Sequence, residues 1–148
     1  MGKMKVGIIG TGNISGIYFQ NGSRFESMEI VACADLDVER AKAKWSEYGI
    51  RGCSVEELLA DPEIQLVINL TIPQAHASVC IQALEAGKHV YVEKPLSVTR
   101  EEGKRVLELA RQKGLRVGSA PDTFLGGGIQ TSIKLIEDGW IGTPIGGT

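Results

Sequence analysis

The sequence predicts an α/β fold, a doubly wound parallel sheet with helices covering both of its faces. Two observations carry this prediction. Strand patterns and helix patterns alternate along the 148 residues with short connections between them, and each parallel crossover needs a covering element of this kind. The expected strands are short apolar runs rich in β-branched residues, which is typical of strands buried on both faces.

The first half of the chain is expected to contain three strands and three helices. KMKVGIIG and MEIVACAD read as buried strands, and a shorter strand follows the second helix. Asp37 can cap the second helix and Gly49 can end it, while SVEE at residues 54–57 is a capping box for the third. In chain order, the expected elements are a strand at residues 3–10, a helix at 13–24, a strand at 28–35, a helix at 38–48, a strand at 50–53 and a helix that ends at 60.

The second half continues the same alternation. Gly87 and Gly114 can each end a helix, and TREE at residues 99–102 is a second capping box. In chain order, the expected elements are a strand at residues 65–70, a helix at 75–86, a strand at 89–93, a helix that ends at 113, a strand at 115–119 and a helix at 129–138. For a doubly wound fold of this kind we expect the strand order 3-2-1-4-5-6.

The last segment of the chain differs in composition, because eight of the 19 glycines fall within residues 118–147. Its final residues, GWIGTPIGGT at 139–148, show no stop signal of a finished terminus. We therefore expect residues 139–148 to begin a connection to a second domain that this chain does not contain.

Composition and charge exclude several classes of protein. A net charge of −2 gives no electrostatic footprint for nucleic acid or for an anionic membrane. The apolar runs are too short to span a bilayer, and no secretory signal precedes the first strand. Cys33, Cys53 and Cys80 are spaced for neither a zinc site nor a disulfide framework. We therefore expect a cytoplasmic protein with reduced, mostly buried thiols, no metal site, and no nucleic-acid or membrane partner.

The turn after the first strand reads GTGNIS and has the pattern of a dinucleotide-binding loop, because it follows a strand and opens a helix. The first glycine permits a tight turn, and the second lets backbone N–H groups approach a pyrophosphate at the positive end of the helix. Ser15 stands where the pattern has Gly or Ala, but it is small enough to keep helix and strand close. A plain glycine turn is the alternative. The residues expected to contact the cofactor are Gly10, Thr11, Gly12, Asn13 and Ile14.

The acidic end of the second strand bears on which cofactor binds. In this fold, a carboxylate at Asp35 accepts hydrogen bonds from the adenosine ribose hydroxyls and repels a 2′-phosphate. Asp37 competes for this role on sequence alone, but its place before a helical pattern favours a cap. Arg40 could reach a 2′-phosphate, although such an arginine is more often a solvated surface residue. The balance favours NAD over NADP.

The fourth strand ends in TIPQAH, residues 71–76, at the same edge of the sheet. His76 would lie in the first turn of the next helix, where the helix dipole disfavours imidazolium, so a neutral hydrogen-bonding role is the functional interpretation. A surface histidine is the equal alternative. His89 begins a strand at the opposite edge and is expected to be structural. One histidine on this edge is too few ligands for a metal, and no serine elbow supports a hydrolase.

The fifth strand ends in Glu93, Lys94 and Pro95. A strand running out into solvent would explain these residues without any function. The alternative is a lysine held at the carboxyl edge of the sheet, where α/β proteins bind their ligands. There Lys94 would face the nicotinamide half of a dinucleotide, hydrogen-bond a substrate hydroxyl and help take its proton. Because the fifth strand should lie beside the fourth, near the glycine turn, we favour the second interpretation.

Together these motifs resemble the Gfo/Idh/MocA family (glucose–fructose oxidoreductase / inositol dehydrogenase). KVGIIGTGNIS resembles the family's opening, VACADLDVERA its acidic second strand, ALEAGKHVYVEKPLSVT its most specific signature and GWIGTP its entry to a second domain. The resemblance implies a Rossmann dinucleotide-binding domain over residues 1–148, with Lys94 as the catalytic residue. It also implies a cofactor site formed by the turns after the fourth and fifth strands, with the residues Thr71, Ile72, Pro73, His76, Glu93 and Lys94.

The same resemblance implies a function. We expect the NAD(P)-binding half of an oxidoreductase that transfers a hydride between nicotinamide and a secondary alcohol of a sugar, inositol or related polyol. Family members continue into a domain with partner acid/base residues, most substrate contacts and an oligomer interface, so the full-length protein is expected to be a homo-oligomer. The chain alone should fold and bind dinucleotide without turnover. The alternative is a dinucleotide-binding or sensing module that never catalyses.

Overall fold

The computed structural model describes residues 2–121 and 123–147. Its sheet has six strands in the order β3-β2-β1-β4-β5-β6, and every neighbouring pair is parallel. The predicted fold class and strand order are therefore confirmed. The strands are β1 (Met4–Ile9), β2 (Met28–Ala34), β3 (Arg51–Cys53), β4 (Leu66–Asn69), β5 (His89–Val92) and β6 (Val117–Ser119).

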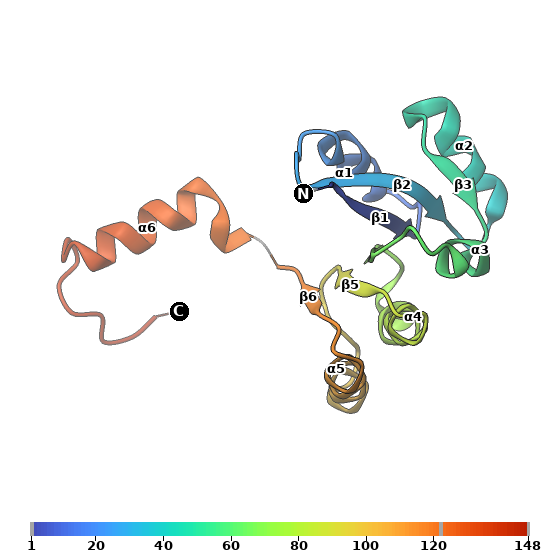
Figure 1. The fold of residues 1–148 in the computed structure, drawn as a ribbon. Coiled ribbons are helices and arrows are strands. Elements are labelled where there is room, and N and C mark those ends of the chain that lie inside the picture. Colours follow the sequence, from blue (N-terminus) through green and yellow to red (C-terminus); the bar gives the residue numbers. More distant parts are fainter. Residues whose placement is uncertain (1, 122, 148) are drawn as a thin grey trace.

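The helices alternate with these strands along the chain (Figure 1). They are α1 (Ser15–Gly22), α2 (Val38–Tyr48), α3 (Val55–Ala60), α4 (Pro73–Glu85), α5 (Arg100–Lys113), the 3-10 helix η1 (Thr123–Leu125) and α6 (Gly127–Glu137). The helix η1 was not predicted.

The predicted caps are present. The Asp37 carboxylate accepts from the backbone N–H groups of Glu39 and Arg40, and Gly49 ends α2 with a φ of 69°. Ser54 and Thr99 each open a helix with a complete capping box. Local side-chain chemistry therefore fixes the ends of α2, α3 and α5, as the sequence predicts.

Most element boundaries differ from prediction by one or two residues; helix α1, for example, is Ser15–Gly22 rather than 13–24, and α6 begins at Gly127 rather than residue 129. Two of these differences have a local reason. Helix α4 begins at Pro73 rather than residue 75, because the fixed φ of proline suits the first helical position. Strand β6 begins at Val117 rather than residue 115. The N–H of Leu115 donates to the carbonyl of Ala110 at 2.9 Å, so this residue belongs to the end of α5.

The helices cover the two faces of the sheet differently. On one face, α3, α4 and α5 pack on the strands through a core whose buried residues include Leu58, Val67, Leu84, Val92 and Val106. On the other face, α1 and α2 pack over β1, β2 and β3 through a second core that includes Val6, Ile8, Phe19, Ala41 and Ile50.

The chain beyond Ala120 lies apart from these cores. Figure 1 shows α6 standing clear of the sheet, and every described residue in 121–147 is exposed. In the part of the chain that the structure describes, no helix is long and apolar enough to cross a membrane. The three cysteines are buried and free, as expected, and burial raises the pKa of Cys33 to about 11.

Candidate functional site

The glycine turn after β1 is shaped by a close backbone contact. Gly10 has a φ of +100°, and a Cβ added there would lie 2.7 Å from the carbonyl carbon and oxygen of Leu70. The N–H of Gly10 also donates to the carbonyl of Ala34 at 2.8 Å. The turn after β1 is therefore pressed between the ends of β2 and β4, which only glycine at position 10 allows.

The other end of the turn is open. A Cβ added at Gly12 would have no atom within 4 Å, so a side chain there would enter the free space in front of the turn. Among the described residues, no side chain caps the N-terminus of α1, and its first turn carries no acidic residue. Backbone N–H groups at such a helix start are available to an anion.

The structure shows why a serine suits position 15, where the glycine pattern has Gly or Ala. Its side chain is buried, and its hydroxyl donates to the carbonyl of Gly12 at 2.7 Å. The N–H of Ser15 donates to the same carbonyl at 3.1 Å. A serine at this position therefore stabilises the turn, in addition to being small.

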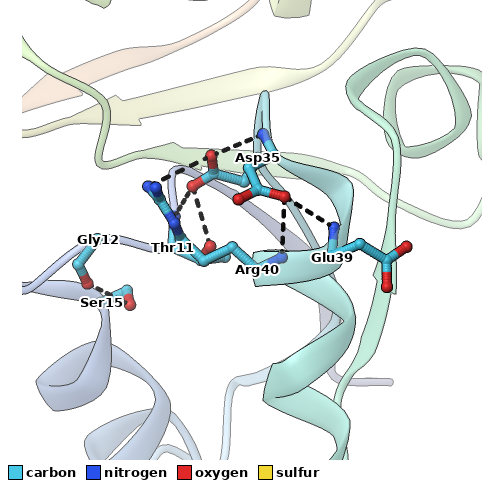
Figure 2. Close-up of polar contacts among 7 residues, drawn as sticks. Thr11, Gly12, Ser15, Asp35, Glu39 and Arg40 are labelled. Atoms are coloured by element: carbon cyan, nitrogen blue, oxygen red, sulfur yellow. Dashed lines mark hydrogen bonds and ion pairs between the residues drawn. The ribbon is translucent and has the colours of Figure 1, made fainter.

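Asp35 lies at the end of β2 and binds the glycine turn directly (Figure 2). Its Oδ2 accepts from the N–H of Thr11 at 2.8 Å and from the Thr11 hydroxyl at 2.9 Å. Its Oδ1 accepts from the N–H of Asp37 at 3.1 Å and lies 3.7 Å from the guanidinium of Arg40. The pattern of the sequence did not reveal these contacts.

The charge of Asp35 follows from the same contacts. Burial raises the pKa of this carboxyl, but hydrogen bonds from Thr11 and Asp37 and the nearby Arg40 guanidinium outweigh that effect, so the pKa lies below its ordinary value. Its side chain is 11% exposed, whereas that of Arg40 is 55% exposed. Asp35 is therefore an anion at neutral pH, held at the edge of the sheet.

A polar pocket of about 450 Å³ lies between the glycine turn and α2. Arg40, Lys44 and Tyr48 line it from α2, and Thr11 and Gly12 line it from the turn. The Lys44 side chain is 16% exposed, and its ammonium lies 5.8 Å from the centre of the Tyr48 ring. Sequence reasoning missed Lys44 and Tyr48, although the spacing i, i+4, i+8 from Arg40 places all three on one face of a helix.

The turn after β4 is held by Asn69, a buried residue that the sequence analysis did not single out. Its Oδ1 accepts from the N–H of Thr71 at 3.1 Å and from the Thr71 hydroxyl at 2.7 Å. Its Nδ2 donates to the carbonyl of His76 at 3.0 Å. Ile72 and Pro73 lie between these residues and are exposed.

His76 is 1% exposed, so the alternative of a surface histidine is wrong. Its Nδ1 lies 2.6 Å from the carbonyl oxygen of Pro95, and its Nε2 lies 3.0 Å from that of Thr71. A neutral imidazole has one N–H and can donate to only one of these oxygens at a time. In either tautomer, the ring lies between the turns after β4 and β5, with a hydrogen bond to one of the two carbonyl oxygens and contact with the other.

Glu93 connects the turn after β5 to α1. Its Oε1 accepts from the hydroxyl of Tyr18 at 2.7 Å, and its Oε2 accepts from the N–H of Lys94 at 3.0 Å. The N–H of Glu93 donates to the carbonyl of Asn69 at 3.0 Å. Lys94 is exposed at this edge. The charged end of β5 is therefore an ordered turn rather than a strand running out into solvent.

The structure brings all the sequence-predicted site residues to one edge of the sheet. The turns after β1, β2, β4 and β5 are connected by the contacts of Gly10 with Leu70, of Thr11 with Asp35 and of His76 with Pro95. Glu93 connects the last of these turns to Tyr18 of α1. Within residues 2–121 and 123–147, no group of three or more His, Cys, Asp or Glu side chains could hold a metal ion. The edge therefore holds the backbone N–H groups at the start of α1, the carboxylates of Asp35 and Glu93, and the cationic side chains of Arg40, Lys44 and Lys94.

Comparisons of the sequence and of the structure with known proteins both find oxidoreductases. Residues 4–120 match the profile of the family described as "Oxidoreductase family, NAD-binding Rossmann fold". The chain is 31% identical over 148 residues to an inositol 2-dehydrogenase from Salmonella typhimurium, covering 96% of this chain and 44% of that protein. It is 32% identical over 141 residues to a 1,5-anhydro-D-fructose reductase from Ensifer adhaerens, covering 94% and 42%.

Among solved structures, a 3-ketoreductase from Actinomadura kijaniata in complex with NADP superposes with a TM-score of 0.87 at 27% identity. The match covers 95% of this chain and 45% of that one. The chain thus spans about two fifths of the length of the curated relatives it matches.

Proposed function

Because the chain belongs to the Gfo/Idh/MocA family of oxidoreductases, we propose that it is the dinucleotide-binding part of a dehydrogenase or reductase. The reaction is hydride transfer between nicotinamide and a secondary alcohol of a sugar, inositol or related polyol. The observation that carries the proposal is the single sheet edge where an open glycine turn, an anionic Asp35 and an exposed Lys94 are held together.

The residues of the edge fit a dinucleotide. Gly12 leaves open space before the uncapped start of α1, which suits a pyrophosphate bound by backbone N–H groups. Bound nicotinamide supplies the hydride acceptor or donor. The residues proposed to contact the pyrophosphate half are Gly10, Thr11, Gly12, Asn13 and Ile14. Those proposed near the nicotinamide half are Thr71, Ile72, Pro73, His76, Glu93 and Lys94.

Lys94 is the proposed catalytic residue. Its exposed ammonium stands on a turn that Glu93 and His76 hold in place, so it can hydrogen-bond a substrate hydroxyl and take or return its proton. His76 acts behind it as a support, because its ring nitrogens lie against the carbonyl oxygens of Thr71 and Pro95.

The proposed cofactor is NAD. The carboxylate of Asp35 disfavours a 2′-phosphate by charge repulsion and can accept from a ribose hydroxyl. Three donors from Thr11 and Asp37 already use most of its lone pairs. A ribose diol therefore has to share this carboxylate with Thr11.

NADP is the second candidate, and a specific observation favours it. Arg40 and Lys44 both line the polar pocket beside the glycine turn, where they could pair with a 2′-phosphate. Calorimetric titration of the chain with NAD and with NADP separates the two. Tighter NADP binding that is lost in Lys44→Met, while NAD binding is kept, would overturn the NAD assignment.

The remaining parts of the proposal concern the larger protein. Residues 1–148 form the dinucleotide-binding domain, and residues 139–148 begin the connection to a second domain that carries substrate contacts and an oligomer interface. The protein works in the cytoplasm on a small-molecule substrate, without a nucleic-acid or membrane partner. A steady-state assay against a panel of polyols and sugars, run beside an NAD titration of the same sample, tests whether turnover requires the second domain. Binding without turnover is expected, and robust NAD reduction by residues 1–148 would contradict it.

A further inference from the structure

The two carboxylate oxygens of Asp35 differ in how many hydrogen bonds they already accept. Oδ2 accepts two, from the N–H and from the hydroxyl of Thr11 (Figure 2). Oδ1 accepts one, from the N–H of Asp37. A carboxylate oxygen has about two lone-pair positions. Thr11 therefore fills both positions on Oδ2, and one position remains on Oδ1.

Arg40 leaves this remaining position open. Its guanidinium lies 3.7 Å from Oδ1, a distance at which the two groups attract each other by charge but form no hydrogen bond. Because the Arg40 side chain is exposed, it can move aside when a ligand arrives. Oδ1 is therefore the oxygen with which Asp35 can accept a hydrogen bond from a ligand hydroxyl.

The Thr11 hydroxyl cannot leave Oδ2 freely. Thr11 is 3% exposed, and in the part of the chain that the structure describes its hydroxyl has no partner other than Asp35. A buried hydroxyl that loses its hydrogen bond is destabilising, because it has already given up its contacts with water. The N–H of Thr11 donates to the same oxygen. Both donors should therefore stay on Oδ2 when a ligand binds beside them.

The proposed ligand would present two hydroxyls to this carboxylate. The adenosine ribose of NAD has a 2′-hydroxyl and a 3′-hydroxyl on neighbouring carbons, and a carboxylate with a free position on each oxygen could accept from both. We propose that Asp35 accepts from only one of the two, and that Thr11 is the specificity-determining residue that sets this limit. The inference rests on the proposed function, since it takes a dinucleotide as the ligand of the glycine turn.

Calorimetric titration of the unmodified chain with two NAD analogues gives the first test. One analogue lacks the 2′-hydroxyl of the adenosine ribose, and the other lacks the 3′-hydroxyl. Removing the hydroxyl that donates to Oδ1 should weaken binding about 10-fold or more, because its acceptor is charged. Removing the other should weaken binding by less than about 3-fold. Similar losses of affinity for the two analogues would overturn the proposal.

Substitutions of Thr11 give the second test. Thr11→Ala removes one donor from Oδ2 and opens space beside this oxygen in the polar pocket that Thr11 lines. The second ribose hydroxyl can then donate to Oδ2, so removing it from the ligand should weaken binding about 10-fold in this variant. Thr11→Ser keeps a hydroxyl and should keep the unequal losses. Thr131→Ala is the matched control, because it makes the same substitution at an exposed position of α6, and it should keep them as well.

The opposite change would contradict the role of Thr11. If the second hydroxyl contributed to binding in the unmodified chain and no longer did so in Thr11→Ala, it would donate to the Thr11 hydroxyl instead of being excluded. An unchanged difference between the analogues in Thr11→Ala would likewise mean that another residue sets the limit. Denaturation curves show whether this variant is folded, and the comparison of the analogues in the unmodified chain does not depend on it.

The same titrations separate this inference from the proposed function. A chain that binds neither NAD nor NADP would refute both. A chain that binds NAD and loses the same affinity with each analogue would keep the proposed function and refute only the limit set by Thr11.

Discussion

The two glycines of the turn after β1 should respond in opposite ways to substitution. Gly12→Val places a side chain where the structure has no atom within 4 Å of the Cβ position, so the free energy of unfolding should change by no more than about 0.5 kcal/mol. The side chain would, however, occupy the space through which a pyrophosphate reaches the backbone N–H groups.

The loss of binding can be worked out from those N–H groups. A hydrogen bond to a charged group contributes about 1.5–3 kcal/mol, so losing one of them weakens dinucleotide binding by about 10- to 150-fold. Gly10→Ala should instead damage the fold, because its Cβ would lie 2.7 Å from the Leu70 carbonyl at a φ of +100°. We expect a cost of about 2 kcal/mol or more for that variant.

Calorimetric titration with the dinucleotide and chemical denaturation of the same samples measure the two quantities. Gly2→Val is the matched control, since a Cβ at position 2 also meets no atom within 4 Å but lies outside the turn. This control should bind and unfold like the unmodified chain. If Gly12→Val bound the dinucleotide with unchanged affinity, the glycine turn would not be the pyrophosphate site.

Three further predictions follow from the other turns. The pKa of Asp35 is lowered from 3.8, so the charge of this carboxylate stabilises the fold above that pH. The free energy of unfolding that Asp35→Asn loses at pH 7 should therefore become smaller when denaturation is repeated below about pH 4. A difference that does not change with pH would argue against the Thr11 contacts. His76→Ala should lower the free energy of unfolding by about 2–4 kcal/mol in a denaturant titration, because it leaves a buried cavity and removes the side chain that lies between two turns. A loss below about 1 kcal/mol would contradict this bridging role. In the enzyme completed by its second domain, Lys94→Ala should lower kcat by about 10²–10⁴-fold with little change in NAD affinity. Substitution of the exposed Lys104 by alanine is the control and should leave both quantities unchanged. If Lys94→Ala had near-normal turnover, Lys94 would be a surface residue without a catalytic role.

The sequence predicted those parts of the fold that depend on local chemistry. Asp37, Ser54 and Thr99 cap their helices as expected, because a cap satisfies backbone groups within three residues of itself. The strand order was predicted because the alternation of elements indicates a doubly wound fold, for which this order is typical. The start of α4 could have been placed correctly as well, since Pro73 marks a first helical position.

The contacts that build the candidate site were beyond sequence reasoning. Tyr18 and Glu93 are 75 positions apart, and no periodic pattern says which side chains meet across two turns. The role of Asn69 was missed for the same reason, because its partners become neighbours only when β4 turns into α4. The pairing of Thr11 with Asp35 likewise depends on β1 and β2 lying side by side.

The cross-connections among the turns have a consequence for ligand binding. Every described buried side-chain nitrogen or oxygen in the structure has a hydrogen-bond partner, and the Asn69 and His76 bridges belong to this set. A ligand that binds at this edge would therefore meet turns whose buried polar groups are already paired, so those groups would lose little further conformational freedom on binding. We expect such a ligand to bind without a rearrangement of the Asn69 and His76 contacts.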